Sequence, residues 1–178
     1  MVDSLFISEL STIAEHSGCV LSWLRSTWDD PENVFAETLV PSGNCPGALI
    51  AVAEDGPVGV LTFKLHPVPR RMIDELWINA VYVVPKFRRR GVGRRLIRSA
   101  VAHSIPGFAK RLFVFTDVPN LYEPLGWERI DFSSTFGSYT LRFEPSTTIA
   151  RANGKPSESI DSLTGQSRIQ MPSAQANR

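Results

Sequence analysis

Apolar runs typical of β-strands occupy the middle of the chain. Residues 48–54 and 58–65 flank Asp55-Gly56, and this dipeptide between two apolar runs is a strong signal for a tight hairpin turn. We therefore expect these two strands to pair antiparallel. A third run, residues 76–84, is apolar throughout except for Asn79, which is the pattern of a strand covered on both faces.

Helical periodicity precedes these strands. Ser8 can cap a short helix over residues 8–16, with Gly18 as its stop signal. Apolar residues then recur at helical spacing over residues 20–28. Asp30-Pro31 provides the cap and first-turn proline of a third short helix.

A second helical region follows the third strand. The pattern predicts a helix from about residue 92 to the stop signal Pro106-Gly107. Its buried side is expected to consist of Leu96, Ile97, Ala100 and Val101. Residues 111–116 form the next predicted strand, and the helix between it and the preceding strand requires the two strands to be parallel.

The last predicted elements are strands at residues 128–132 and 139–143, which form a hairpin. The complete pattern predicts an α/β (α+β) fold: a mixed, mostly antiparallel sheet with a central parallel strand pair and helices on both faces. Residues 1–144 make up this domain. Residues 145–178 contain no aromatic residue and many small polar ones, which indicates a disordered polar tail.

Composition narrows the class of protein. A chain of 178 residues that is 43% hydrophobic can form one domain with a sizeable core. No apolar stretch reaches the roughly 18 to 20 residues that span a bilayer, and the first residues lack a basic secretion signal, so a cytoplasmic protein with free Cys19 and Cys45 thiols is expected. The scattered histidines, His16, His66 and His103, predict no metal site.

Charge is uneven along the chain, although the net charge is only +1. Six of the ten residues 86–95 are basic. One interpretation is a nucleic-acid-binding module that uses Lys86, Arg88, Arg89, Arg90, Arg94 and Arg95. Against it, the cluster is confined to one turn without an interleaved aromatic platform, and the glycine spacing stays unexplained.

That spacing favours a phosphate site instead. Residues 88–93 read Arg-Arg-Arg-Gly-Val-Gly directly after a strand and open a helix, whose first backbone N–H groups have no intrahelical partners. Gly91 permits a backbone conformation closed to other residues, and Gly93 allows close packing of helix on strand. The arginines add charge, so the turn is typical of a pyrophosphate site.

Two motifs in this order resemble the GNAT N-acyltransferase superfamily. The first is V-x-V-x-P followed by R-x-x-G-x-G, over residues 81–93. The second is N-L-Y-E-P-L-G-W, over residues 120–127, similar to the superfamily's Y-x-x-x-G-(F/W) segment. The resemblance extends over about residues 8–144 and implies an acetyl-CoA-dependent N-acetyltransferase, which transfers an acetyl group directly to an amine of a small molecule, peptide or protein.

The resemblance also assigns roles to residues. Tyr122 takes the position near the departing sulfur, and a backbone N–H near Val83 polarises the carbonyl. Asp74 and Glu75 are candidate bases for the amine, Asp117 is a comparable one, and the sequence does not choose among them. The implied acetyl-CoA contacts are Val81, Val83, Arg88, Arg89, Arg90, Gly91, Val92, Gly93, Arg94 and Asn120.

Several alternatives stay open. The connection from Thr116 to Tyr122 is short, and Pro119 and Pro124 leave little room for a regular helix, which suggests an inactive CoA-binding sensor as an alternative. Trp23, Trp28 and Phe35 could line an acceptor pocket, although their helical spacing favours core packing. The acceptor amine is unidentified, and the pattern permits a monomer or a homodimer.

Overall fold

The computed structural model describes residues 4–28, 34–68, 73–105, 107–130 and 138–145. Of the predicted tail, therefore, only Pro145 belongs to the described residues. The ends of two predicted elements, Pro106 and residues 131–132, also lie outside them.

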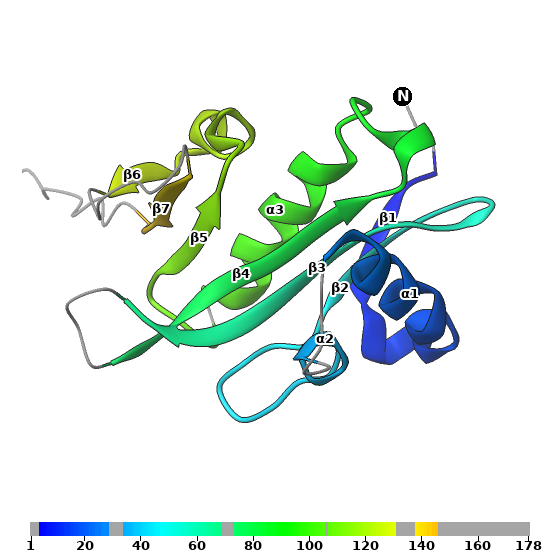
Figure 1. Ribbon diagram of the computed structural model, residues 1–178, viewed down its shortest axis with the longest axis horizontal. Helices are drawn as coiled ribbons and strands as arrows, with labels where there is room; N and C mark the ends of the chain where they lie inside the picture. Colours follow the sequence, from blue (N-terminus) through cyan, green and yellow to red (C-terminus); the bar gives the residue numbers. More distant parts are fainter. Residues whose placement is uncertain (1–3, 29–33, 69–72, 106, 131–137, 146–178) are drawn as a thin grey trace, which may run out of the picture. The chain divides into compact units, whose positions relative to one another are not determined.

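The described residues form a mixed sheet of seven strands in the order β1-β2-β3-β4-β5-β7-β6 (Figure 1). All neighbouring strands are antiparallel except β4 and β5, which are parallel, as the intervening helix predicted. The strands are β1 (Phe6–Glu9), β2 (Leu49–Ala53), β3 (Gly56–Pro67), β4 (Asp74–Val83), β5 (Leu112–Thr116), β6 (Glu128–Ile130) and β7 (Tyr139–Phe143).

Helices cover both faces of the sheet. The helices are α1 (Ser17–Thr27), α2 (Val34–Thr38) and α3 (Val92–Ser104), with 3₁₀ turns η1 (Leu10–His16), η2 (Pro85–Phe87), η3 (Pro119–Leu121) and η4 (Glu123–Leu125). Strand β2 divides the core by simple alternation: Leu49 and Ala51 join the cluster of α3, whereas Ile50 and Val52 join that of α1. The predicted fold class is thus confirmed.

Several element boundaries differ from the sequence prediction. Residues 6–9 form strand β1, because Ser8 pairs with Ile50 in the sheet rather than capping a helix. Gly18 lies inside the first turn of α1 and is not a stop signal. Strand β3 continues to Pro67. Asp74 and Glu75 pair with the end of β3, so both belong to β4 instead of preceding it.

Strands β4 and β5 stay together over a short distance only. Asn79 has no partner in β3, because Phe63 pairs with Ile78 whereas the preceding Thr62 pairs with Ala80, and this leaves a β-bulge in β4. Pairing with β5 is limited to Trp77 with Phe113 and Ile78 with Val114. Beyond this point the two strands diverge (Figure 1).

Phe63 is expected to be a main support of this sheet. Its side chain is 0% exposed and packs in the cluster that joins the sheet to α3. Replacing it with Ala should lower the free energy of unfolding by about 3–5 kcal/mol, since a buried ring is lost and a cavity remains. Urea unfolding measures this. The control is Leu65→Ala in the same strand, where the side chain is 42% exposed and a loss of less than about 1 kcal/mol is expected. Equal losses in the two variants would contradict the assigned core.

Candidate active site

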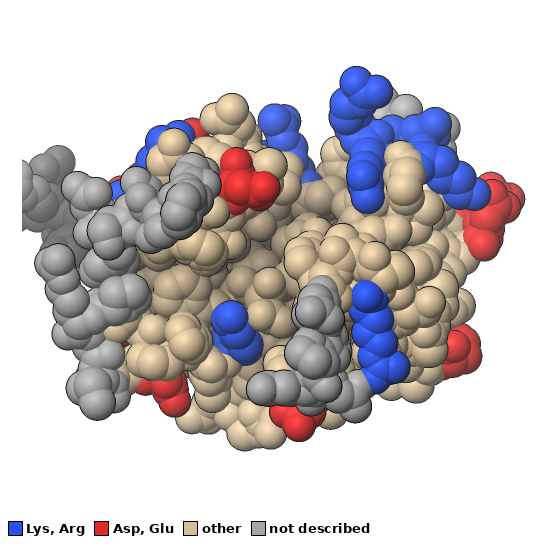
Figure 2. All heavy atoms as spheres, in the orientation of Figure 1, with Lys and Arg blue, Asp and Glu red and all other residues tan. Residues whose placement is uncertain are grey.

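The divergence of β4 and β5 opens a cleft with two connected cavities. The Tyr122 cavity measures about 340 Å³ and is lined by residues of β4, the end of β5 and the segment that follows it. The Gly93 cavity measures about 410 Å³ and lies between the second half of β4 and the start of α3. The two cavities adjoin one another, because they share four lining residues: Trp28, Val81, Val118 and Leu121. Figure 2 shows the hollow in the surface.

The backbone of β4 provides hydrogen-bond donors to this cleft. The Val84 N–H donates to the Val58 carbonyl at 2.9 Å, on the β3 side. Because successive residues of a strand direct these groups to opposite sides, the N–H groups of Val83 and Val81 face the β5 side. Strand β5 has diverged there, so no described strand pairs with these N–H groups and they can meet a ligand. The Val83 carbonyl accepts a hydrogen bond from Arg88 Nε at 2.9 Å.

The start of α3 has the properties of an anion site. Gly91 is its N-cap with φ of 84°, and no side chain caps the helix. The Arg95 N–H donates to the Gly91 carbonyl at 3.0 Å, as the first bond of the helix. The preceding N–H groups, of Val92, Gly93 and Arg94, consequently have no intrahelical partner and lie at the positive end of the helix dipole.

The arginines of the preceding turn divide into two groups. Arg88 and Arg89 line the Gly93 cavity. Arg90 is exposed and lies over the Phe87 ring, and Arg94 is exposed on α3; neither lines the cavity. Figure 2 shows the cluster of Lys and Arg over the end of β4 and the turn after it. Positive charge is therefore concentrated at one end of the cleft.

The two glycines serve different purposes. Gly91 adopts the left-handed conformation that other residues rarely tolerate, as the sequence predicted. Gly93 is not required by tight packing, which was the expected reason. A Cβ there would lie 3.9 Å from Leu121 and Val83, an ordinary contact. Gly93 instead leaves room in the cavity that it lines.

Tyr122 lies in the cleft between η3 and η4. The prolines predicted that no regular helix would form here, and two 3₁₀ turns are found, each with a proline in its first turn. The tyrosine is 3% exposed, and its ring packs edge-on against Trp127 at 5.3 Å between centroids. Burial, together with the negative charge of Asp117, raises the pKa of Tyr122 well above its usual range. The phenol therefore stays protonated and can donate a hydrogen bond or a proton.

This raised pKa makes stability depend on pH. Below about pH 10 the Tyr122 phenol is protonated in both the folded and the unfolded chain, so its contribution is fully present. Above that pH the unfolded chain releases the proton and the folded chain retains it. Folding should then lose about 1.4 kcal/mol of stability for each further pH unit. The free energy of unfolding, measured in urea at increasing pH, should not show this loss above about pH 10 in the Tyr122→Phe variant. The prediction fails if both proteins lose stability equally.

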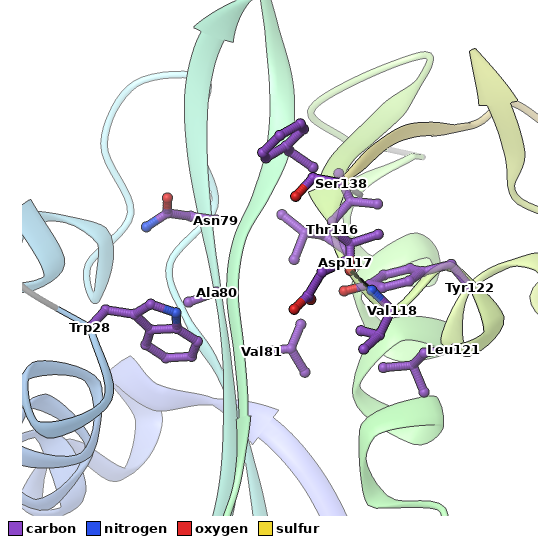
Figure 3. Close-up of a pocket in the computed structure, with 13 residues that line it drawn as sticks. Trp28, Asn79, Ala80, Val81, Thr116, Asp117, Val118, Leu121, Tyr122 and Ser138 are labelled. Atoms are coloured by element: carbon purple, nitrogen blue, oxygen red, sulfur yellow. Dashed lines mark hydrogen bonds between the residues drawn. The ribbon is translucent and has the colours of Figure 1, made fainter. Parts of the chain in front are cut away.

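The candidate bases lie in different places. Asp117 follows β5 and lines the Tyr122 cavity. Figure 3 shows the Asp117 and Tyr122 side chains entering the same part of the cavity, near Val81. Glu75 is partly buried and accepts a hydrogen bond from Arg111 Nη2 at 2.8 Å, and neither it nor Asp74 lines the cleft. Their assignment as bases stays a prediction that this geometry does not support.

Other predicted contacts also vary in position. Asn120 is exposed on η3 and lines neither cavity. Trp28 lines both cavities, whereas Trp23 packs on Tyr82 at 5.4 Å, as expected of a core residue, and Phe35 packs on Trp28 at 5.9 Å.

The sequence interpretation missed some cavity residues. Asn79, Phe115, Thr116 and Ser138 line the Tyr122 cavity and were not proposed for the site. Asn79 carried a signal, because a single polar residue in an apolar strand marks the bulge. Phe115 carried none, since its exposure depends on where β5 separates from β4.

Neither thiol of the chain is part of the cleft. Cys19 and Cys45 are free thiols outside both cavities, and burial raises the pKa of each. In the described part of the chain, no three His, Cys, Asp or Glu side chains are grouped in a way that could hold a metal ion. No described helix combines the length and the apolar character needed to cross a membrane.

Several solved structures are similar to this chain in fold. The chain is similar over 80% of its length to a structure of the NatC complex bound to Gag peptide and CoA, at 18% identity, a TM-score of 0.60 and 99% coverage of that chain. Arabidopsis thaliana NAA60 in complex with a bisubstrate analogue gives 18% identity and a TM-score of 0.56, over 79% of this chain and 98% of that one. An IAA acetyltransferase from Bacillus cereus gives 18% identity and a TM-score of 0.56, over 80% of this chain and 100% of that one. These likenesses show the fold.

Sequence comparison identifies the family. No curated protein matches the chain significantly. The sequence pattern described as "Acetyltransferase (GNAT) family" matches residues 11–127, which is well over half of the chain and includes the Arg88–Gly93 turn and Tyr122. The chain belongs to the GNAT acetyltransferase family.

Proposed function

We propose that this chain transfers an acetyl group from acetyl-CoA to a primary amine of a small molecule or peptide, with both substrates bound at once. One observation carries the proposal: two adjoining cavities bring together the N–H groups of α3 that lack an intrahelical partner, the β4 N–H groups that face the side from which β5 diverges, and Tyr122. An acyl thioester needs these three features: anchoring of its phosphates, polarisation of its carbonyl and protonation of its leaving thiolate.

The Gly93 cavity fits the donor substrate. The N–H groups at the start of α3, with Arg88 and Arg89, hold the pyrophosphate. The cavity wall between this charged end and Tyr122 is mainly apolar, which suits the pantetheine arm; it includes Val81, Val83, Phe87, Val92 and Leu121.

Val81 is the best-placed residue to polarise the carbonyl. It lines both cavities, whereas Val83 lines only the Gly93 cavity. Its N–H stabilises the negative charge that develops on the thioester oxygen when the amine nitrogen attacks the carbonyl carbon. The C–S bond then breaks, and the Tyr122 hydroxyl donates a proton to the thiolate.

The same contacts argue against the alternatives. A sensor without catalysis would not need a phenol in the cavity, and Tyr122 lines it. A nucleic-acid module would leave the Gly93 cavity unexplained, and of its six basic residues Arg88 and Arg89 line that cavity while Arg95 donates to the Leu5 carbonyl. A covalent acetyl-cysteine route lacks a thiol in either cavity. A cytoplasmic location and a monomeric or homodimeric state stay predictions.

The proposal is tested by adding acetyl-CoA and a panel of primary amines to the purified chain. We expect release of free CoA thiol that depends on the amine, and binding of acetyl-CoA in isothermal titration without it. Failure of acetyl-CoA to bind would overturn the proposal. Binding without thiol release on any amine would favour the sensor.

A further inference from the structure

The charge of the Tyr122 cavity indicates what it can bind. Among the described residues that line it, Asp117 is the sole charged side chain, and no Lys, Arg or His is present. The Gly93 cavity carries the opposite sign, through Arg88 and Arg89. The cleft is thus positive at the end assigned to phosphates and negative at the other. An ammonium group suits the negative end, whereas a carboxylate there would meet like charge and no cation.

Two exposed aromatic side chains form part of the wall of this cavity. Phe115 is 61% exposed and Trp28 is 38% exposed, and both line the cavity. Large apolar side chains left in contact with water on a cavity wall are typical of a binding site for an apolar group. An aromatic face also attracts a nearby cation. The cavity therefore offers a place for an apolar substituent beside the place for an ammonium.

We propose that the acceptor is a primary amine that carries an apolar or aromatic group and no neighbouring carboxylate, with Asp117 binding its ammonium and, after the attack, accepting a proton from its nitrogen. This inference rests on the proposed function. It selects Asp117 over Asp74 and Glu75, because Asp117 alone of the three lines the cavity that holds Tyr122. A small amine and the amino terminus of a peptide share this chemistry.

Two protons leave the acceptor nitrogen during acetyl transfer. The bound ammonium releases one proton to solvent, and the free amine attacks the thioester carbon. The new N–C bond makes the remaining N–H bonds far more acidic, and the Asp117 carboxylate takes the second proton. Tyr122 protonates the leaving thiolate and regains a proton from solvent, to which Asp117 in turn releases the proton that it accepted. One proton is released in each turnover.

The first test compares acceptors. The kcat/KM for acetylation is measured with 2-phenylethylamine, phenylalanine amide, a peptide with amino-terminal phenylalanine, and free phenylalanine. The three acceptors without a carboxylate beside the amine should give a kcat/KM at least about tenfold higher than that of free phenylalanine, which is the effect of one unfavourable charge contact. The amine and the peptide distinguish the two sources. Equal or faster acetylation of free phenylalanine would overturn the inference.

The second test uses variants. Asp117→Asn should lower kcat/KM for 2-phenylethylamine by about 100-fold, as expected for loss of a general base. The matched control, Asp55→Asn, removes an exposed carboxylate in the β2–β3 turn and should change nothing. Phe115→Ala should reduce the preference for 2-phenylethylamine over ethylamine several-fold. Retention of full rate by Asp117→Asn, or its loss in Glu75→Gln instead, would contradict the role of Asp117.

A binding measurement separates this inference from the proposed function. Titration of 2-phenylethylamine into the CoA-saturated protein should give binding that Asp117→Asn weakens about tenfold. If the wild type binds the amine in this way but transfers no acetyl group, the proposed function fails and the acceptor site stands. If transfer occurs without dependence on Asp117 or on the acceptor's carboxylate, the acceptor site fails and the function stands.

Discussion

Tyr122→Phe is expected to lower kcat by about 100- to 1,000-fold, which is the usual effect of removing a general acid. The substitution removes one hydroxyl and preserves the ring that packs against Trp127. Because the proposed phosphate contacts lie in the Gly93 cavity, the dissociation constant of acetyl-CoA should change by no more than about threefold, less than the loss of one hydrogen bond. Assays of thiol release measure kcat, and isothermal titration of acetyl-CoA measures its dissociation constant.

Tyr139→Phe is the matched control. Tyr139 lies on β7, and its ring is covered by the Arg129 guanidinium at 4.3 Å, outside both cavities. Its loss of a hydroxyl should leave kcat unchanged. If Tyr122→Phe kept most of the activity, the leaving thiolate would have to obtain its proton from water, and the catalytic role of Tyr122 would be wrong.

Gly93→Asp is expected to weaken acetyl-CoA binding about 100-fold while leaving the fold intact or more stable. Gly93 is the second residue of α3, where a carboxylate interacts favourably with the helix dipole and a glycine is unfavourable. A gain of roughly 0.5–1.5 kcal/mol in unfolding free energy is therefore expected. The same carboxylate repels a bound phosphate and occupies its donors, so affinity and stability should change in opposite directions.

Gly93→Ala distinguishes charge from size. An added Cβ would make ordinary contacts at 3.9 Å with Leu121 and Val83, so the affinity for acetyl-CoA should change only a few-fold. Titration of both variants, with thermal unfolding, checks the pair. If Gly93→Asp bound acetyl-CoA as tightly as Gly93→Ala, the phosphates would lie elsewhere than at the start of α3.

Local patterns were sufficient to predict much of the fold. The Asp55-Gly56 turn, the apolar run of β4 and the helical spacing of α3 each agree with the structure, because their burial follows directly from their own periodicity. Strand β1 was missed, since a four-residue edge strand has too short a pattern to compete with a helix cap at Ser8. Its pairing with β2 is a long-range contact that the local sequence does not encode.

The site was predictable to a different extent in its two halves. The phosphate end follows from Gly91 and the charge around it, which are local properties of a turn. The Tyr122 cavity depends on where β4 bulges at Asn79 and where β5 separates from it. Because the strands separate there, Asp117 lines the cavity, whereas Glu75 pairs with Arg111. No spacing in the sequence distinguishes these two carboxylates.

Transfer of a labelled acetyl group tests the central claim most directly. The chain is incubated with acetyl-CoA that is isotopically labelled in its acetyl group, together with 2-phenylethylamine and other primary amines, and the label is located by mass spectrometry. Direct transfer in the cleft predicts label on the amine nitrogen in an amount equal to the thiol released, and none on Cys19, Cys45 or any other residue of the chain. Label retained on the protein, or label found only in free acetate, would contradict it.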